Sequence, residues 1–275
     1  MSSAINRRVL PGFSLSLGYT LFYLSLLVLL PLAACFLKAA SLSLGQFWAT
    51  VWTERARSAY ALTVGASFVA ALANVFLGLL IAWVLVRYEF PCKRLFDALV
   101  DLPFALPTAV AGLVYSSLYV PSGWLGQFLV PLGIEGAYSR LGIVLVLVFT
   151  GLPFVVRTVQ PVLDGLDAEV EEAAASLGAT RWQIFRRVLL PPLVPALLTG
   201  FALALARALG EYGSVIFIAG NMPYRTEIAP VLIVARLEEF AYSEATALAV
   251  VLLTGSFLLL GLVNLLERWS KRHGD

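Results

Sequence analysis

The chain has 275 residues, of which 60% are hydrophobic and 13% are charged, against about 45–50% and about 25% in ordinary soluble domains. Its formal charge is +2, and the 19 Lys and Arg residues lie in short clusters between apolar runs. This composition excludes a conventional soluble protein and a disordered chain, and it gives no support to nucleic-acid binding. Two cysteines and one histidine exclude a Cys/His zinc site. We therefore expect a chain whose solvent is a lipid bilayer.

Four apolar runs contain no Asp, Glu, Lys or Arg and are each long enough to cross a membrane. They are Val9–Leu37, Ser58–Val86, Leu102–Ile134 and Ala245–Leu266. Two further runs are interrupted or bracketed by charges: Leu141–Val156, and Val188–Ala206 with its continuation Tyr212–Tyr224. Together the runs predict an all-α membrane protein with six transmembrane helices.

The third run is longer than one span requires. Pro103 and Pro107 are expected to bend or break its first turns, because proline lacks the N–H that a helix needs. The turn residues of Pro121–Trp124 predict that this helix ends near Tyr119.

The positive charges of the connecting segments predict the orientation. With the N-terminus inside, Arg207 stays in the membrane, and the outside set is Lys38, Arg55, Arg57, Arg140, Arg225 and Arg236. The larger inside set is Arg7, Arg8, Arg87, Lys93, Arg94, Arg157, Arg181, Arg186, Arg187, Arg268, Lys271 and Arg272. Both termini are therefore predicted to be cytoplasmic.

One face of the second span carries Ala66, Ala70, Asn74 and Gly78, spaced four residues apart. Small residues at this spacing predict close packing against another helix. Asn74 has two interpretations: a buried hydrogen bond between helices, or a place in the wall of a pathway.

The inside segment Arg157–Pro191 is predicted to form two short helices. Asp167 is expected to cap the first helix, with Glu169, Glu171 and Glu172 in its opening turns. Gly178 is expected to end that helix in the left-handed conformation. Thr180 and Gln183 match a capping box that begins the second helix, and Pro191 and Pro192 are expected to close it.

The second helix places Trp182, Phe185 and Leu189 on one face. This pattern has two interpretations: an amphipathic helix that lies on lipid headgroups, or a rigid corner that docks another protein. The sequence contains no Gly-rich phosphate loop ending in Lys and Ser or Thr, so any nucleotide chemistry would come from another polypeptide.

The segment from Glu172 through Ala173, Ala174 and Gly178 to the sequence Val188-x-Leu190-Pro191 resembles the EAA loop of ABC importer permease subunits, with Val in place of the usual Ile. The resemblance implies the type I ABC importer permease fold, similar to molybdate and methionine permeases. It also implies that Glu172, Ala173, Ala174 and Gly178 couple the chain to a separate ATPase subunit. The implied organisation is an N-terminal helix and connection (1–57), a permease core (58–267) with its coupling loop (164–191), and a basic tail (268–275).

The stretches Arg207–Asn221 and Arg236–Phe240 resemble the T-type permeases of bacterial sulfate/thiosulfate importers. This resemblance implies a multi-pass protein of the bacterial inner membrane, with no catalysis or bound cofactor of its own. Its implied partners are a homologous second permease, two ATP-binding subunits that use ATP and Mg, and a sulfate-binding protein. Molybdate permeases share the Arg, Gly and Glu spacing, so molybdate or tungstate import remains an alternative.

Three charged sites near or within the spans need an explanation. Arg207 and Glu211 lie four residues apart on the expected fifth helix, either as an ion pair that locks helix packing or with Arg207 helping an anion to cross. Asp101 is either a helix-start charge or part of a proton relay. The segment Thr226–Phe240 is predicted at the outer surface, where it would close the pathway or meet a binding protein.

Two rival functions have less support in the sequence than the importer. An ion-coupled secondary transporter often shows inverted repeats and broken helices at corresponding positions, and the sequence shows no such duplication. An intramembrane enzyme needs converging catalytic groups, which His273 and two separated cysteines do not supply.

Overall fold

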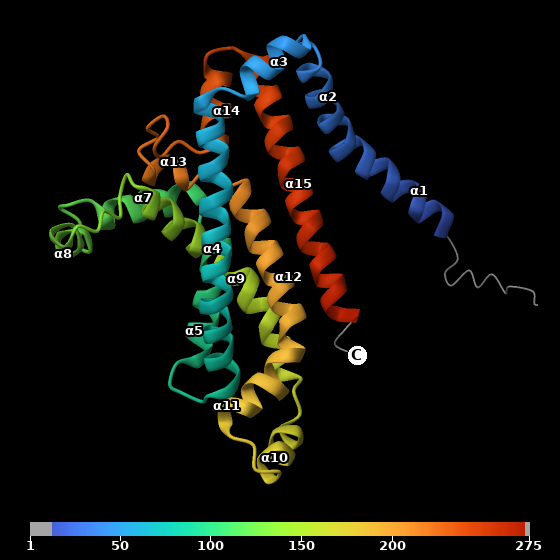
Figure 1. Cartoon of the computed structure of the whole chain (residues 1–275), viewed down its shortest axis with the longest axis vertical. Coiled ribbons are helices and arrows are strands. Elements are labelled where there is room, and N and C mark those ends of the chain that lie inside the picture. The colour runs from blue at the N-terminus through green and yellow to red at the C-terminus, as the bar shows by residue number, and fades with distance from the viewer. Residues whose placement is uncertain (1–12, 273–275) are drawn as a thin grey trace, which may run out of the picture.

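A computed structural model describes residues 13–272, which form helices joined by turns without any strand in that range (Figure 1). The predicted all-helical fold is therefore confirmed. Arg7, Arg8 and His273, which entered the sequence predictions, lie outside the described residues. Five helical stretches within this range are long and apolar enough to cross a membrane: Leu15–Ala39, Glu54–Arg87, Arg140–Asp164, Arg181–Leu209 and Tyr242–Leu265.

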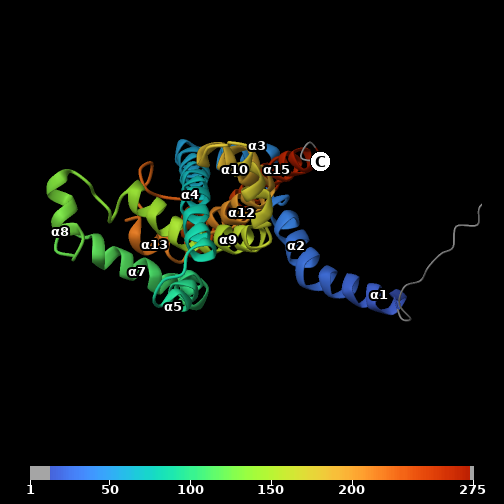
Figure 2. The same ribbon diagram turned by 90° about the horizontal axis from the view of Figure 1, so that it is seen from below.

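The first apolar run forms α1 (Phe13–Leu24) and α2 (Leu30–Ala39), joined by a π turn. α2 packs on the C-terminal helix α15 (Tyr242–Arg272), whereas α1 stands away from the rest of the chain (Figures 1 and 2). The short helix α3 (Leu44–Val51) then leads into α4 (Glu54–Arg87), whose first turn is capped by the Thr53 side chain.

The core is formed by α4, α9 (Arg140–Asp164) and α12 (Leu190–Leu209). A Cβ atom on Gly78 of α4 would lie 2.7 Å from the Val155 side chain, and one on Gly200 of α12 would lie 2.9 Å from the Val155 Cα. Only glycine permits helices to approach this closely. The close packing predicted from the small-residue face of α4 is confirmed.

The third apolar run is not one helix. It forms α6 (Leu102–Ala105) and α7 (Thr108–Tyr119), followed by the short α8 (Gly126–Leu129), after a break at Leu106 and Pro107. Proline supplies no backbone N–H and disfavours the helical conformation of the preceding residue. The predicted break and the predicted end at Tyr119 are both confirmed. At 12 residues, α7 is about 18 Å long, so the count of six spans remains a prediction.

The fourth and fifth spans differ from their predicted limits. α9 extends to Asp164 rather than Val156, with Pro153 and Pro161 inside it. The helical stretch of the fifth span passes through Pro191 and Pro192 without ending, because a π turn at Phe185–Leu189 connects it to α12. The expectation that these prolines close the cytoplasmic helix was therefore wrong. The π-helix is rare, and it occurs mostly as single turns inserted within α-helices.

The expected continuation of the fifth span at Tyr212–Tyr224 is also wrong. α12 ends at Leu209, and the chain turns at Gly210–Ser214 before the short α13 (Val215–Ile218). The Ser214 backbone N–H and hydroxyl both donate to Glu211 Oε1, which holds this turn closed. The following helix α14 (Ala229–Glu238) packs on α15, beside α3 at one end of the molecule (Figure 1).

Gly112 provides a test of the contact between α7 and the turn that precedes α13. A Cβ atom at Gly112 would lie 2.2 Å from the Ser214 carbonyl oxygen, so Gly112→Ala is expected to destabilise the protein by about 2 kcal/mol. Gly65→Ala is the matched control, because no heavy atom lies within 4 Å of its Cβ position and alanine favours helices. Thermal unfolding of both purified variants checks this; equal unfolding temperatures would contradict it.

Candidate functional site: a coupling corner and two ion-pair clusters

The corner predicted from Gly178 is present at the end of the molecule opposite α3 (Figure 1). It joins α10 (Ala168–Ser176) to α11 (Arg181–Ile184), and Gly178 has φ +84°. The N–H groups of Gly178 and Ala179 donate to the carbonyl oxygens of Ala175 and Ala174 at 2.9 and 3.1 Å. This is the Schellman arrangement, which favours glycine at the left-handed position.

The capping box between Thr180 and Gln183 is confirmed, with both reciprocal bonds formed. Asp167 occupies the predicted capping position of α10, but its side chain makes no capping bond. Its backbone carbonyl instead accepts from the Val170 N–H at 3.2 Å. The predicted helix start is therefore correct, and the predicted side-chain interaction is not.

The outer surface of the corner is apolar as well as small. Glu172, Ala173 and Gly178 are exposed, and Ala174 is half-buried. Leu177 is 89% exposed. The sequence predictions overlooked Leu177, because it lies off the stripe of Trp182 and Phe185; its position directly before Gly178 was the available signal.

The corner is attached to the end of α4. Arg87 Nη2 lies 2.5 Å from Glu171 Oε1, with both side chains mostly buried. The Arg87 guanidinium also lies 5.3 Å from the centre of the Trp83 ring, and that ring packs edge-on against Phe185. The corner and the end of α4 are therefore joined by an ion pair and by aromatic packing.

Exchanging the two charges tests this attachment. Glu171→Arg alone places two cations together, which we expect to lower transport at least about threefold by repulsion. The double variant Glu171→Arg with Arg87→Glu restores an opposite pair and is expected to recover most of the activity. Uptake per ATP hydrolysed by the reconstituted complex is the measurement. Glu169→Arg is the control, because it reverses an exposed charge two residues earlier in the same helix. Equal losses in both single variants would contradict the prediction.

A second charged cluster fixes α5 (Lys93–Val100) to α9. Arg157 Nε and Nη2 donate to the two carboxylate oxygens of Asp101 at 2.9 and 2.6 Å, and Nη1 donates to Asp97 Oδ1 at 2.6 Å. A hydrogen bond from Gln160, together with Arg157, holds the pKa of Asp97 below its ordinary value. Asp101 makes no helix-capping bond. Its carboxylate is engaged in a bidentate ion pair, which favours a structural role over a proton relay.

Arg207 and Glu211 form the predicted ion pair. Arg207 lies in the last turn of α12, and Glu211 lies beyond its end rather than on the same helix. The Glu211 side chain is 2% exposed, whereas that of Arg207 is one-third exposed. Glu211 thus joins the end of α12 to the following turn through both Arg207 and Ser214. The role of Arg207 in an anion pathway remains a prediction.

The two predicted sites are separate. Helix α12 has 20 residues, which corresponds to roughly 30 Å, and it separates the coupling corner from the Arg207–Glu211 pair. Within residues 13–272, no group of three His, Cys, Asp or Glu side chains is placed to hold a metal.

Asn74 lies between these sites, against Gly151 of α9. Its side chain is buried, and neither of its polar atoms has a hydrogen-bond partner among the described residues. A Cβ atom on Gly151 would lie 2.5 Å from Asn74 Nδ2. The predicted interhelical hydrogen bond is therefore not made.

Comparison with known proteins agrees with these features. Residues 74–272 match the family of binding-protein-dependent transport system inner membrane components. The chain is 51% identical over 273 residues to the sulfate transport system permease protein CysT of Salmonella typhimurium, covering 99% of each chain. It is 50% identical over 273 residues to the protein of the same name from Escherichia coli, again covering 99% of each.

Solved structures show the same fold. A bacterial ABC transporter involved in the import of the acidic polysaccharide alginate matches with a TM-score of 0.76 at 18% identity, covering 93% of this chain and 94% of that one. The MetNI methionine ABC transporter matches with a TM-score of 0.57 at 19% identity, covering 85% and 100%. The chain belongs to the family of binding-protein-dependent transport system inner membrane components, and it has the fold of type I ABC importer permeases.

Proposed function

We propose that this protein is the permease subunit of an ATP-driven importer of sulfate and thiosulfate. The observation that carries the proposal is the 51% identity, over nearly the whole chain, to a sulfate transport system permease. The proposal assigns this chain the transmembrane pathway, and it assigns ATP hydrolysis to a partner that also holds the Mg.

The geometry of the coupling corner supports the assignment of the pathway to this chain and of ATP hydrolysis to a separate partner. We place Glu172, Ala173, Ala174 and Gly178 at the contact with the ATPase, with Leu177 added from the structure. Closure of an ATPase dimer would move the corner, and the Arg87–Glu171 pair would pass that movement to α4. The spans would then open alternately to the two sides of the membrane, and hydrolysis would reset them.

The complex we propose contains a second homologous permease, two ATPase subunits and a sulfate-binding protein. A bacterial alginate ABC transporter with a similar fold has been solved in complex with an alginate pentasaccharide-bound periplasmic protein. The separation of α1 from the body of the chain (Figure 2) supports an assembly in which another subunit or lipid covers its exposed apolar side chains. We place both termini and the coupling corner on the cytoplasmic side, and α14 on the outer side.

Reconstituted vesicles test the proposal. We expect labelled sulfate uptake by the purified complex with its binding protein to require ATP and to persist without an ion gradient. Molybdate and tungstate uptake under the same conditions separates the alternative oxyanions. Gradient-driven uptake by this chain alone would reject the importer in favour of a secondary transporter.

A further inference from the structure

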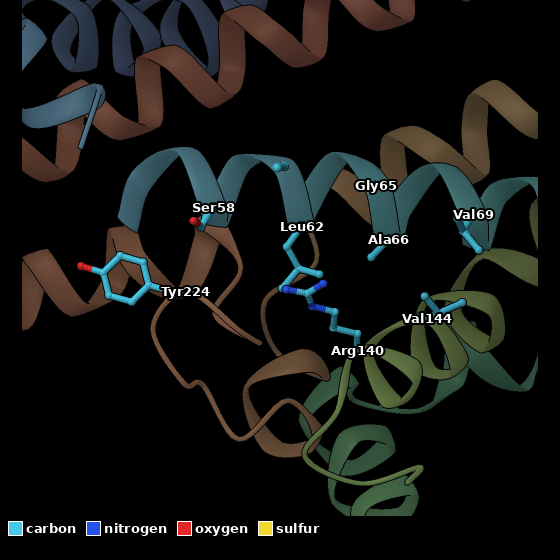
Figure 3. A pocket seen from close by; sticks show the side chains of 9 residues that line it. Ser58, Leu62, Gly65, Ala66, Val69, Arg140, Val144 and Tyr224 are labelled. Carbon is cyan, nitrogen blue, oxygen red and sulfur yellow. The ribbon is translucent and has the colours of Figure 1, made fainter. Parts of the chain in front are cut away.

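A cleft of about 450 Å³ lies between the first half of α4 and the start of α9. Its α4 wall is built mainly from small or apolar residues, and Arg140 and Val144 of α9 extend toward that wall (Figure 3). Tyr224 also lines the cleft. The α4 residues that line it are Ser58, Ala61, Leu62, Gly65, Ala66 and Val69. The cleft lies in the half of α4 that is remote from Arg87 and the coupling corner, and it does not include Arg207 or Glu211.

Arg140 supplies the positive charge of the cleft. Its side chain extends from the start of α9 toward α4, and both Arg140 and Leu62 line the cleft (Figure 3). The Nε atom donates to the backbone carbonyl of Arg225 at 2.9 Å in an exposed hydrogen bond. Among the described residues, Arg140 makes no ion pair, whereas Arg55, Arg87, Arg157, Arg207 and Arg236 each do. Its Nη1 and Nη2 donors thus remain available.

The chemistry of this arrangement is specific. A guanidinium with two parallel donors matches two oxygens of a tetrahedral oxyanion. The cleft is large enough for the anion to keep part of its hydration. One charge in a water-accessible cleft gives binding that is weak enough for release, as conduction through a pathway requires. The backbone at Gly65 keeps the opposite wall open, because no heavy atom lies within 4 Å of its Cβ position.

We propose that this cleft is a binding site for the divalent tetrahedral oxyanion during transport, with Arg140 as the residue that contacts it. The inference rests on the proposed function, since it assigns a site to the anion that the importer carries. It is distinct from the Arg207 hypothesis, because the cleft is built by different residues and its arginine is not neutralised by a carboxylate.

Transport by matched variants is the first test. Arg140→Gln is expected to lower the maximal rate of sulfate uptake about tenfold or more, because it removes a charge-assisted contact. Arg57→Gln is the control, since Arg57 packs over Trp52 and does not line the cleft. Gly65→Leu should also lower the rate by filling the cleft. Unchanged uptake in Arg140→Gln and Gly65→Leu complexes that assemble normally would overturn the proposal.

A thiol-labelling experiment tests binding of the anion in the cleft and does not require a measurement of transport. In the assembled complex with Cys35 and Cys92 replaced by serine, a Gly65→Cys thiol is treated with anionic and cationic thiol reagents of similar size. The ratio of anionic to cationic labelling rates should fall about fivefold or more when Arg140→Gln is added. Added sulfate should slow the labelling only when Arg140 is present. The proposal would be overturned if the thiol reacts with neither reagent. It would also be overturned if the ratio of anionic to cationic labelling rates is the same with and without Arg140→Gln.

Two further experiments identify which anion occupies the cleft. They also distinguish failure of the cleft proposal from failure of the proposed importer function. Protection by sulfate in phosphate-free detergent supports the transported anion, whereas protection that appears only in phosphatidylglycerol vesicles would assign the cleft to lipid headgroups and overturn the proposal. If the unmodified complex imports molybdate but not sulfate, the proposed substrate fails. Arg140-dependent protection by molybdate would then still support the site.

Discussion

Replacing Leu177 with aspartate is expected to weaken the association between this chain and the proposed ATPase subunit at least about tenfold. Burial of a leucine side chain stabilises an interface by about 1.5–3 kcal/mol, and each 1.4 kcal/mol corresponds to about tenfold in affinity. Leu177 is 89% exposed on the coupling corner, so nearly all of its side chain is available for burial by a partner. Aspartate would in addition place a charge in that contact.

The measurement is the affinity of the purified ATPase for the permease complex in lipid nanodiscs, together with the ATPase activity that the binding protein stimulates. Leu44→Asp is the matched control: Leu44 is 80% exposed, but it lies on α3, at the end of the molecule opposite the corner (Figure 1). The control should bind the ATPase with normal affinity. Normal binding by the Leu177→Asp variant would show that the corner surface is not the docking site.

Removal of Arg207 alone is expected to be far more damaging than removal of the whole ion pair. Arg207→Met leaves the carboxylate of Glu211 buried without its cation, and breaking a buried pair in this way costs about 3 kcal/mol. The double variant Arg207→Met with Glu211→Gln removes both charges, and glutamine can still accept from Ser214. We expect it to recover most of the lost stability, as measured by unfolding of the solubilised complex.

The double variant also decides between the two roles of Arg207. If it folds and imports sulfate at the normal rate, the pair serves only helix packing. If it folds and binds the proposed ATPase normally but imports poorly, the positive charge is needed by the anion. Equal destabilisation of the single and double variants would contradict the assignment of the loss to an unpaired Glu211.

The features that sequence predicted well are encoded locally. The end of α10 at Gly178 and the start of α11 at Thr180 each depend on residues within one helical turn. Both boundaries can therefore be predicted from the sequence alone. The break before α7 is local in the same sense, because Pro107 acts on itself and on Leu106. These elements lie where the sequence placed them.

The features that sequence missed depend on residues far apart in the chain. Arg87 meets Glu171, and Arg157 meets Asp97, only after α4, α5, α9 and α10 have packed. No spacing rule connects such residues. The turn after Arg207 was missed for another reason: hydropathy favours continuation of the helix, whereas the hydrogen bonds from Ser214 to Glu211 stabilise a turn instead.

Helix α4 runs unbroken for 34 residues without an internal proline, a length of about 50 Å. Its final turn holds the coupling corner through Arg87, and its first half forms one wall of the Arg140 cleft. A continuous helix of this kind resists compression along its axis. An axial displacement of its last turn would therefore also displace its first half. The nucleotide cycle on one face of the membrane would thereby set the width of an anion cleft near the opposite face, with no intervening relay of side chains.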